Sequence, residues 1–275
     1  MVSTRVLLAQ LAPRTHDVAA NVATACDLLA RHPDADLAVF PELFVHAYAL
    51  KGLVPLDLDG HPGPLAPLLA CAGAQGTAVV VGVAERQGGA MANTALCVDE
   101  RGTVVGRYRK VHLFGAERRF FVAGDEYTVV RLAGVAVGVL NCYDIEFPEP
   151  ARALAVAGAQ LLVTVSANMD PYAEDHRLFL RVRALENGLP HVYVNCVGQE
   201  GRLRFCGGSA AADAAGRVVA ALPAYRPAVE VVDVPLGTPD AVIPEYLAER
   251  RTDVPVRSGA GAGAPGAAAR GHTAP

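Results

Sequence analysis

Three reactive side chains stand at the ends of apolar stretches that are far apart in the sequence. Glu42 follows Leu-Ala-Val-Phe-Pro, Lys110 follows Val-Val-Gly-Arg-Tyr-Arg, and Cys142 follows Val-Ala-Val-Gly-Val-Leu-Asn. Such stretches indicate buried strands, and open α/β sheets collect their chemistry beyond the carboxyl ends of these strands. A carboxylate, an ammonium group and a thiol that meet there supply the base, oxyanion partner and nucleophile of acyl transfer.

Each of the three residues also has an ordinary structural interpretation. A buried free cysteine is usually a small core hydrophobe, and a lysine at a strand end is usually solvated. Cys142 differs from a core cysteine because Tyr143-Asp144 follows it, so the chain leaves the core there. A thiol becomes a nucleophile only when a base or a cation favours its thiolate. The hypothesis of acyl transfer therefore depends on the combination of the three residue types.

The hydrophobic pattern around these residues predicts strands that alternate with helices. The expected strands span residues 5–10, 37–40, 77–84, 94–98, 103–108, 127–132, 135–140, 161–165, 191–197, 208–213, 217–221 and 229–234. The expected helices span residues 18–31, 64–72, 148–157 and 174–187. Hairpins over residues 94–108 and 127–140 imply that the sheets have mixed pairing.

Individual residues mark the helix ends and the domain limits. Asp17 can cap the first helix, and Gly188 follows the last one. The last helix is predicted to bury an apolar face formed by Leu178, Val182 and Leu185. We predict a single domain over residues 1–254. Residues 255–275, rich in Gly and Ala, have almost nothing to bury and are expected to form a disordered tail.

Composition and charge favour small molecules, or a second copy of the chain, as partners. The chain has 275 residues, of which 52% are hydrophobic, enough for a deep core. Its formal net charge is −4, so no global field attracts nucleic acid or an anionic membrane. The basic residues between positions 101 and 119 alternate with apolar and acidic ones, as on a solvated strand face. No uncharged apolar stretch reaches about 18 residues, so no membrane span is expected.

The six cysteines predict neither a metal site nor a disulfide framework. They stand at positions 26, 71, 97, 142, 196 and 206. No Cys-x-x-Cys pair and no zinc-type histidine spacing accompanies them, so no metal is expected. The first ten residues hold too short an apolar run for a signal peptide. We therefore expect a reduced, cytoplasmic location.

Three ordered motifs make the chain similar to a known family. They are Phe40-Pro41-Glu42-Leu43-Phe44, Tyr108-Arg109-Lys110-Val111-His112-Leu113 and Asn141-Cys142-Tyr143-Asp144-Ile145-Glu146-Phe147-Pro148-Glu149. Supporting matches are Arg183-Ala184-Leu185-Glu186-Asn187-Gly188 and Gly207-Gly208-Ser209. Over residues 4–235 the chain resembles the nitrilase (carbon-nitrogen hydrolase) superfamily. The resemblance implies an α/β fold, a four-layer α-β-β-α sandwich with mixed sheets, that forms a homodimer or higher homo-oligomer.

The resemblance also implies catalysis by a Glu-Lys-Cys triad, which here is Glu42, Lys110 and Cys142. Glu42 takes the thiol proton, Cys142 attacks a carboxamide carbonyl, and Lys110 with the backbone N–H of Tyr143 stabilises the oxyanion. Ammonia leaves, and water then releases the acid from the thioester. This chemistry needs no cofactor. Many members add a second glutamate after the lysine, and Glu117 matches it best.

Two neighbouring residues have competing interpretations. Alternatively, Glu117 is a surface carboxylate paired with Arg118 or Arg119. His112 shares a face with Lys110 by strand alternation, and we expect it to pack or hydrogen-bond behind the lysine rather than act as a base.

The substrate class is suggested by Glu146, which stands where many family members have an arginine. A carboxylate at the pocket repels acidic substrates and favours an ammonium-bearing one. The combination of Cys-Tyr-Asp-Ile-Glu-Phe-Pro-Glu with Lys-Val-His-Leu-Phe-Gly resembles aliphatic amidases of amino-bearing amides, such as 5-aminopentanamidase and the R-stereoselective amidases. Alternatively, Glu146 caps the following helix or pairs with Arg152. Further pocket candidates are Tyr48, Phe114, Asn168 and Met169.

Other functions are compatible with these motifs. The same triad serves nitrilases, N-carbamoyl amine amidohydrolases and amide-forming acyl transferases, because all pass through a thioester or thioimidate. A catalytically silent binding protein with the same fold is the alternative outside enzymes. The intact triad argues against it, and the compact length argues against an added synthetase domain.

Overall fold

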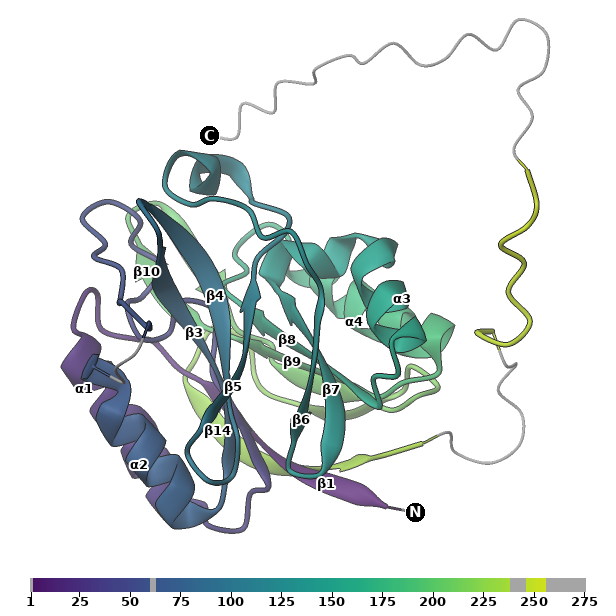
Figure 1. Cartoon of the computed structure of the whole chain (residues 1–275), viewed down its shortest axis with the longest axis horizontal. Coiled ribbons are helices and arrows are strands. Elements are labelled where there is room, and N and C mark those ends of the chain that lie inside the picture. Colours follow the sequence, from purple (N-terminus) through teal and green to yellow (C-terminus); the bar gives the residue numbers. More distant parts are fainter. Residues whose placement is uncertain (1, 60–62, 238–245, 256–275) are drawn as a thin grey trace, which may run out of the picture.

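The computed structural model describes residues 2–59, 63–237 and 246–255. Two six-stranded sheets lie face to face, and each carries a pair of helices on its outer side (Figure 1). This confirms the predicted four-layer α-β-β-α sandwich. Within the described ranges no helix is long and apolar enough to cross a membrane. The predicted tail over residues 255–275 lies, apart from its first residue, outside the described part of the chain.

The first sheet has the strand order β14-β1-β2-β3-β4-β5. Its strands are β1 (Ser3–Gln10), β2 (Leu37–Val39), β3 (Ala78–Gln87), β4 (Ala90–Val98), β5 (Val104–Arg109) and β14 (Ala228–Pro235). β1, β2 and β3 are parallel, and the other pairs are antiparallel. The outer face is covered by α1 (Val18–Arg31), capped as predicted by Asp17, and α2 (Ala66–Gln75), which follows the short 3-10 helix η1 (Gly63–Leu65).

The second sheet has the strand order β13-β12-β9-β8-β7-β6. Its strands are β6 (Thr128–Leu132), β7 (Val135–Asn141), β8 (Leu161–Ser166), β9 (His191–Asn195), β12 (Ala210–Ala212) and β13 (Val218–Ala221). β7, β8 and β9 are parallel, as buried central strands commonly are. The outer face is covered by α3 (Pro148–Val156) and α4 (Ala173–Asn187). A separate hairpin pairs β10 (Val197–Glu200) with β11 (Leu203–Cys206).

The main core lies between the two sheets. Alternate residues of facing strands fill it, including Val6 and Leu8 on β1 and Val137 and Val139 on β7, and all four are fully buried. Burying one such aliphatic side chain is worth about 1.5–3 kcal/mol. This core fixes both sheets relative to each other, so side chains at their strand ends keep a defined separation.

The prediction that α4 buries Leu178, Val182 and Leu185 is wrong. Leu178 is 57% exposed and Leu185 is 39% exposed. The buried side of the helix carries instead His176, Leu180, Arg183, Ala184 and Asn187. Polar residues are buried there because they bind protein groups, as when Arg183 Nε donates to Ile145 O at 3.0 Å. The end of the helix at Gly188 agrees with the prediction.

Other differences concern hairpins and one helix start. β3 and β4 continue into a hairpin across Gly88-Gly89, and β10 and β11 form a hairpin of their own, although neither was predicted. The polar residues in these ribbons hide the strand pattern. Pro64 lies in η1 rather than in α2, which extends to Gln75 instead of Ala72.

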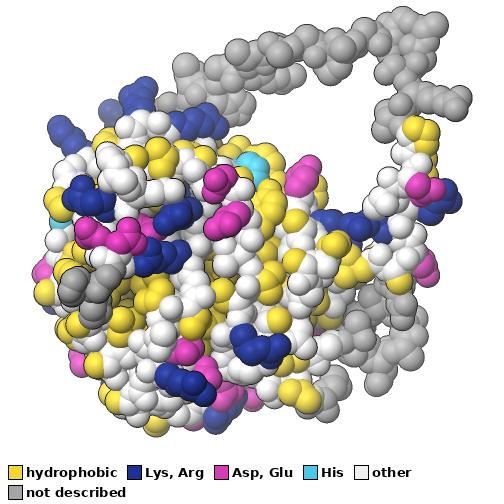
Figure 2. Space-filling model, in the orientation of Figure 1, with side chains coloured by type: hydrophobic (Ala, Val, Ile, Leu, Met, Phe, Trp, Pro, Cys, Tyr) yellow, Lys and Arg dark blue, Asp and Glu magenta, His cyan; other side chains and the backbone are white. Residues whose placement is uncertain are grey.

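The basic residues of β5 are paired with acids. Arg109 Nη2 lies 2.9 Å from Glu85 Oε1, and Arg107 Nη1 lies 3.1 Å from the same oxygen and 2.8 Å from Asp59. The face shown in Figure 2 likewise has basic and acidic side chains interspersed with apolar ones. Arg107 and Arg109 are thus partly exposed, but Lys110 in the same basic run is fully buried, so the interpretation as a solvated strand face is wrong for Lys110.

Candidate active site

The turn that carries Glu42 rests directly on β3. β2 ends at Val39, and Gly82 N–H donates to Pro41 O at 3.1 Å. A Cβ atom at Gly82 would stand 2.4 Å from that oxygen, so only glycine allows the turn to approach so closely. The Glu42 side chain is thereby buried, with 1% of the residue exposed.

Lys110 joins two carboxylates inside the protein. It follows the last residue of β5, and its Nζ donates to Glu42 Oε1 at 2.7 Å and to Glu117 Oε1 at 2.9 Å. Glu117 lies in the 3-10 helix η2 (Gly115–Arg119), where its Oε2 accepts from Phe114 N–H at 2.7 Å. Tyr48 Oη donates to Glu117 Oε1 at 2.7 Å. Glu117 is fully buried, so its interpretation as a surface carboxylate is wrong.

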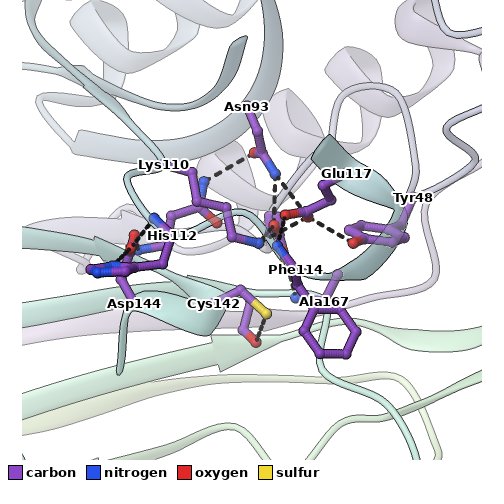
Figure 3. A network of polar contacts seen from close by, with 12 residues as sticks. Tyr48, Asn93, Lys110, His112, Phe114, Glu117, Cys142, Asp144 and Ala167 are labelled. Atoms are coloured by element: carbon purple, nitrogen blue, oxygen red, sulfur yellow. Dashed lines mark hydrogen bonds and ion pairs between the residues drawn. The ribbon is translucent and has the colours of Figure 1, made fainter. Parts of the chain in front are cut away.

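Cys142 begins the 3-10 helix η3 (Cys142–Glu146) directly after β7, with a φ of 47°. A non-glycine residue in this region is strained and commonly marks a functional site. Ser166 Oγ donates to Cys142 Sγ at 3.3 Å, while the next N–H, from Ala167, donates to Glu42 Oε2 at 2.9 Å. Two consecutive residues therefore hold the thiol and the carboxylate side by side. Lys110, Glu117 and Cys142 approach one another from three segments in Figure 3.

The electrostatics of the group follow from burial and its three charges. Burial raises the pKa of Glu42 above its usual value, and Lys110 opposes this effect. Burial alone would lower the pKa of Lys110, but Glu117 and Glu42 outweigh it and raise that pKa well above its usual range. Burial and the nearby Glu42 raise the pKa of Cys142 well above its ordinary value. At rest, Lys110 is therefore an ammonium and Cys142 a neutral thiol.

Asp144 connects the lysine segment to the cysteine turn. Its Oδ2 accepts from Tyr108 Oη at 2.7 Å and its Oδ1 from His112 N–H at 2.9 Å, while Asn141 N–H also donates to the carboxylate. His112 Nδ1 lies 2.8 Å from Asp144 Oδ1, and its ring stacks on Phe147. His112 thus packs and hydrogen-bonds as expected, but strand alternation with Lys110 is not the reason, because β5 ends at Arg109.

Asn93 is a site residue that the sequence patterns did not single out. From β4, its Nδ2 donates to Glu42 Oε1 at 2.7 Å, and its Oδ1 accepts from Asn141 Nδ2 at 3.0 Å. Asp144, Ser166, His176 and Tyr193 were likewise assigned no role. One signal was present, because Asn93 and Ser166 are polar residues beside apolar strand stretches, where burial without a partner is costly.

The cavity next to this group has a wide outer part and a narrow inner part. The outer part has a volume of about 470 Å³. Tyr48, Phe114, Met169 and Tyr172 line both parts. The inner part also reaches Cys142, Tyr143, Glu146, Asn168 and His176, but has free space of only about 10 Å³, close to that of one water.

The predicted pocket residues thus share one cleft, with different tasks. Tyr48 holds Glu117, and the ring of Phe114 meets that of Tyr143 edge-on at 5.2 Å. Asn168 uses its amide on backbone groups, accepting from Met169 N–H at 2.9 Å and donating to Tyr172 O at 3.1 Å. The side chain of Asn168 therefore shapes the wall of the inner cleft.

Glu146 borders the inner cleft, and its side chain is 28% exposed. Its Oε1 lies 3.3 Å from His176 Nε2. The two alternative interpretations are wrong, because Arg152 donates to Glu186 O at 2.7 Å and the cap of α3 is Phe147, without a side-chain bond. Among the described residues no group of three or more His, Cys, Asp or Glu is arranged to hold a metal ion.

Known proteins share this arrangement of sequence and fold. The chain matches the carbon-nitrogen hydrolase family over residues 5–243. It is 40% identical to an (R)-stereoselective amidase of Pseudomonas sp., over 78% of this chain and 79% of the relative. It is 38% identical to a Pseudomonas protegens protein called hydrolase in pqqF 5'region, over 91% and 90% of the two chains.

A solved amidase from Nesterenkonia sp. superposes with a TM-score of 0.80 at 33% identity, covering 90% of this chain and 93% of that one. A variant of that amidase carries the acetamide moiety of fluoroacetamide covalently at its active-site cysteine. Another variant is in complex with butyramide. With its fold, its motifs and these relatives, the chain belongs to the carbon-nitrogen hydrolase family.

Proposed function

We propose that this enzyme hydrolyses a small aliphatic carboxamide to the acid and ammonia through a thioester on Cys142. One observation carries the proposal: the adjacent groups Ser166 Oγ and Ala167 N–H bind the thiol and the Glu42 carboxylate, with Lys110 on that same carboxylate. The similarity to amidases of Pseudomonas and Nesterenkonia supports amides as the substrates.

In the first half-reaction, Glu42 takes the thiol proton as the sulfur of Cys142 attacks the carbonyl carbon. The raised pKa of Glu42 makes it a stronger base, and the transfer keeps the buried group at one net negative charge. Lys110 and the N–H of Tyr143 stabilise the oxyanion. One such donor is typically worth ~100- to 1000-fold in rate. Collapse of the tetrahedral adduct breaks the carbon-nitrogen bond, and Glu42 returns the proton to the leaving ammonia.

In the second half-reaction, Glu42 removes a proton from water as the water oxygen attacks the thioester carbon. The carbon-sulfur bond then breaks, the acid leaves, and the sulfur recovers its proton from Glu42. Glu117, which also accepts from Tyr48 Oη, binds Lys110 as a second carboxylate beside Glu42, so the ammonium stays in place through both steps.

The substrate proposal rests on the shape and charge of the cleft. The inner part at Cys142 leaves room for only about one water-sized group, which favours a small substrate, and the outer cavity of about 470 Å³ accepts the rest of the molecule. Glu146 at the inner wall favours a substrate with an ammonium group. We expect Glu146→Gln to reduce kcat/KM for ω-amino amides about tenfold relative to neutral amides. Glu149→Gln, an exposed carboxylate on α3, is the matched control. A wild-type preference for dicarboxylic monoamides would overturn this substrate class.

Ammonia release from a panel of amides, nitriles and N-carbamoyl amines tests the reaction itself. Amides are expected to react fastest. Faster turnover of nitriles or N-carbamoyl amines would favour the corresponding alternative with the same triad, and no turnover with any of them would favour a silent binding protein.

We also propose a homodimer that works in the cytoplasm on small molecules, without nucleic acid or membrane partners. The dimer follows from the family resemblance, and the cytoplasm from six cysteines that are all free. Light scattering during size-exclusion chromatography and cell fractionation test the two points, and a monomer or a membrane fraction would contradict them.

A further inference from the structure

A line of four hydrogen bonds joins the sulfur of Cys142 to the carboxylate of Glu146. Ser166 Oγ donates to Cys142 Sγ at 3.3 Å, and Tyr193 Oη donates to Ser166 Oγ at 3.1 Å. His176 Nδ1 lies 3.0 Å from Tyr193 Oη, and His176 Nε2 lies 3.3 Å from Glu146 Oε1. The line therefore begins at the nucleophile and ends at the wall of the substrate cleft.

The middle of this line is shielded from water. Ser166 is fully buried, His176 is 2% exposed and Tyr193 is 3% exposed. Hydrogen bonds in such surroundings polarise one another more strongly than they do in water. Glu146 is the most exposed of these partners, with 28% of its side chain accessible against 3% for His176, so it is the end at which solvent or substrate can act.

The direction of the donors depends on His176. A carboxylate only accepts, so Nε2 carries a hydrogen toward Glu146. If Nδ1 also carries a hydrogen, it donates to Tyr193, whose hydroxyl then donates to Ser166. If Nδ1 carries no hydrogen, the hydroxyl of Tyr193 donates to Nδ1 instead of to Ser166. Ser166 Oγ then accepts only from Asn168 N–H, at 3.2 Å. Ser166 donates to the sulfur in both arrangements, but more strongly in the first.

We propose that Ser166, Tyr193 and His176 form a relay of positioning residues that transmits the charge state of Glu146 to the sulfur of Cys142. The relay rests on the proposed function in one respect, namely that Cys142 is the nucleophile. It favours the thiolate by donating a hydrogen bond to it from Ser166 Oγ. It also makes the reactivity of the sulfur sensitive to what binds Glu146.

Other titratable groups near His176 are placed differently. Tyr143 and Tyr172 line the same cleft, and Tyr193 faces the ring from β9 at a centroid distance of 5.6 Å. Arg183, on the same helix, directs its guanidinium to Ile145 O and to Glu146 O, both at 3.0 Å. Of the contacts made by the His176 ring, the carboxylate of Glu146 is the charged one.

The test is the rate at which iodoacetamide alkylates Cys142 in the folded enzyme, followed by mass spectrometry of that peptide across pH. A hydrogen bond to a charged group changes the equilibrium between the thiol and the thiolate by about tenfold or more. Ser166→Ala should slow alkylation at neutral pH by about 10-fold and shift the profile to higher pH by about 1 unit. Tyr193→Phe should slow it about 3-fold, and kcat should fall while KM stays unchanged.

A matched control lies on the same two strands. Thr164 Oγ1 and His191 Nε2 form a buried pair at 2.8 Å between β8 and β9, and the pair does not touch Cys142. Thr164→Val should leave the alkylation profile unchanged, whatever it costs in thermal stability. Ser166→Thr keeps the hydroxyl and should restore the profile, which a merely structural role of Ser166 would not require. If Tyr193→Phe lowers stability, His176→Gln provides a second break in the relay.

The outcomes separate the relay from the proposed function. A wild-type alkylation profile in both Tyr193→Phe and His176→Gln would overturn the relay, even if amides are hydrolysed. Shifted profiles in these variants would support it, even if no amide in the panel is turned over, because alkylation does not depend on the substrate.

Discussion

Replacing Asn93 with alanine should move the acid limb of the pH–rate profile to higher pH. Asn93 Nδ2 donates to Glu42 Oε1 at 2.7 Å, and this bond lowers the pKa of Glu42. Burial has already raised that pKa, and the variant removes one of the donors that oppose burial. Since Glu42 acts as a base only when ionised, activity is lost as pH falls through its pKa.

The magnitude follows from the type of bond. A hydrogen bond to a charged group contributes about 1.5–3 kcal/mol, and one pKa unit corresponds to about 1.36 kcal/mol. The limb should therefore shift upward by about 1–2 pH units. Below the limb, kcat/KM should fall roughly 10- to 100-fold relative to wild type, whereas above it the loss should be smaller. The measurement is the initial rate of ammonia release from the best amide, with kcat/KM determined from acidic to mildly alkaline pH.

The control is the neighbouring residue on the same strand. Thr94 Oγ1 donates to the buried carboxylate of Glu85 at 2.8 Å, outside the active site. Thr94→Ala loses a bond of the same kind and should leave the acid limb where it is. An unchanged or acid-shifted limb in Asn93→Ala would refute the assignment of Glu42 as the titrating base.

Three further outcomes are expected. Cys142→Ala should fold, with an unchanged circular dichroism spectrum, and release no measurable ammonia; near wild-type turnover would reject the nucleophile. Gly82→Ala should displace the Glu42 turn, because its Cβ would stand 2.4 Å from Pro41 O, and reduce kcat about 100-fold, whereas Gly89→Ala, with open space around it, should not. Chelators should leave the rate of ammonia release unchanged because Lys110 supplies the positive charge at the oxyanion; inhibition that added metal reverses would contradict this reasoning.

The order of strands and helices could be predicted because it depends on local patterns. The apolar stretch before Cys142 is a strand, Asp17 caps α1, and Gly188 ends α4 in the left-handed region. Each of these signals lies within a few residues of the structure that it specifies. The hairpin of β10 and β11 was missed because β10, with Gly198 and Gln199, lacks an apolar alternation, although the short β11 has one at Leu203 and Phe205.

Periodicity failed on α4 because it measures amphipathicity and not contacts. The helix buries His176 and Arg183 and exposes Leu178, since η3 offers acceptors for the polar groups. Burying a polar side chain is tolerated when such partners exist, and the partners come from a distant part of the chain.

The sequence by itself determined the chemistry: a carboxylate, an ammonium and a thiol at strand ends, in the order and context of the carbon-nitrogen hydrolases. Only the tertiary structure decided which groups tune them. Asn93 reaches Glu42 across 51 positions and Ala167 reaches it across 125. Ser166 became a partner of Cys142 only because β7 and β8 are adjacent in the sheet. Hydrogen bonds form between groups that are close in space, and no spacing along the chain records that closeness.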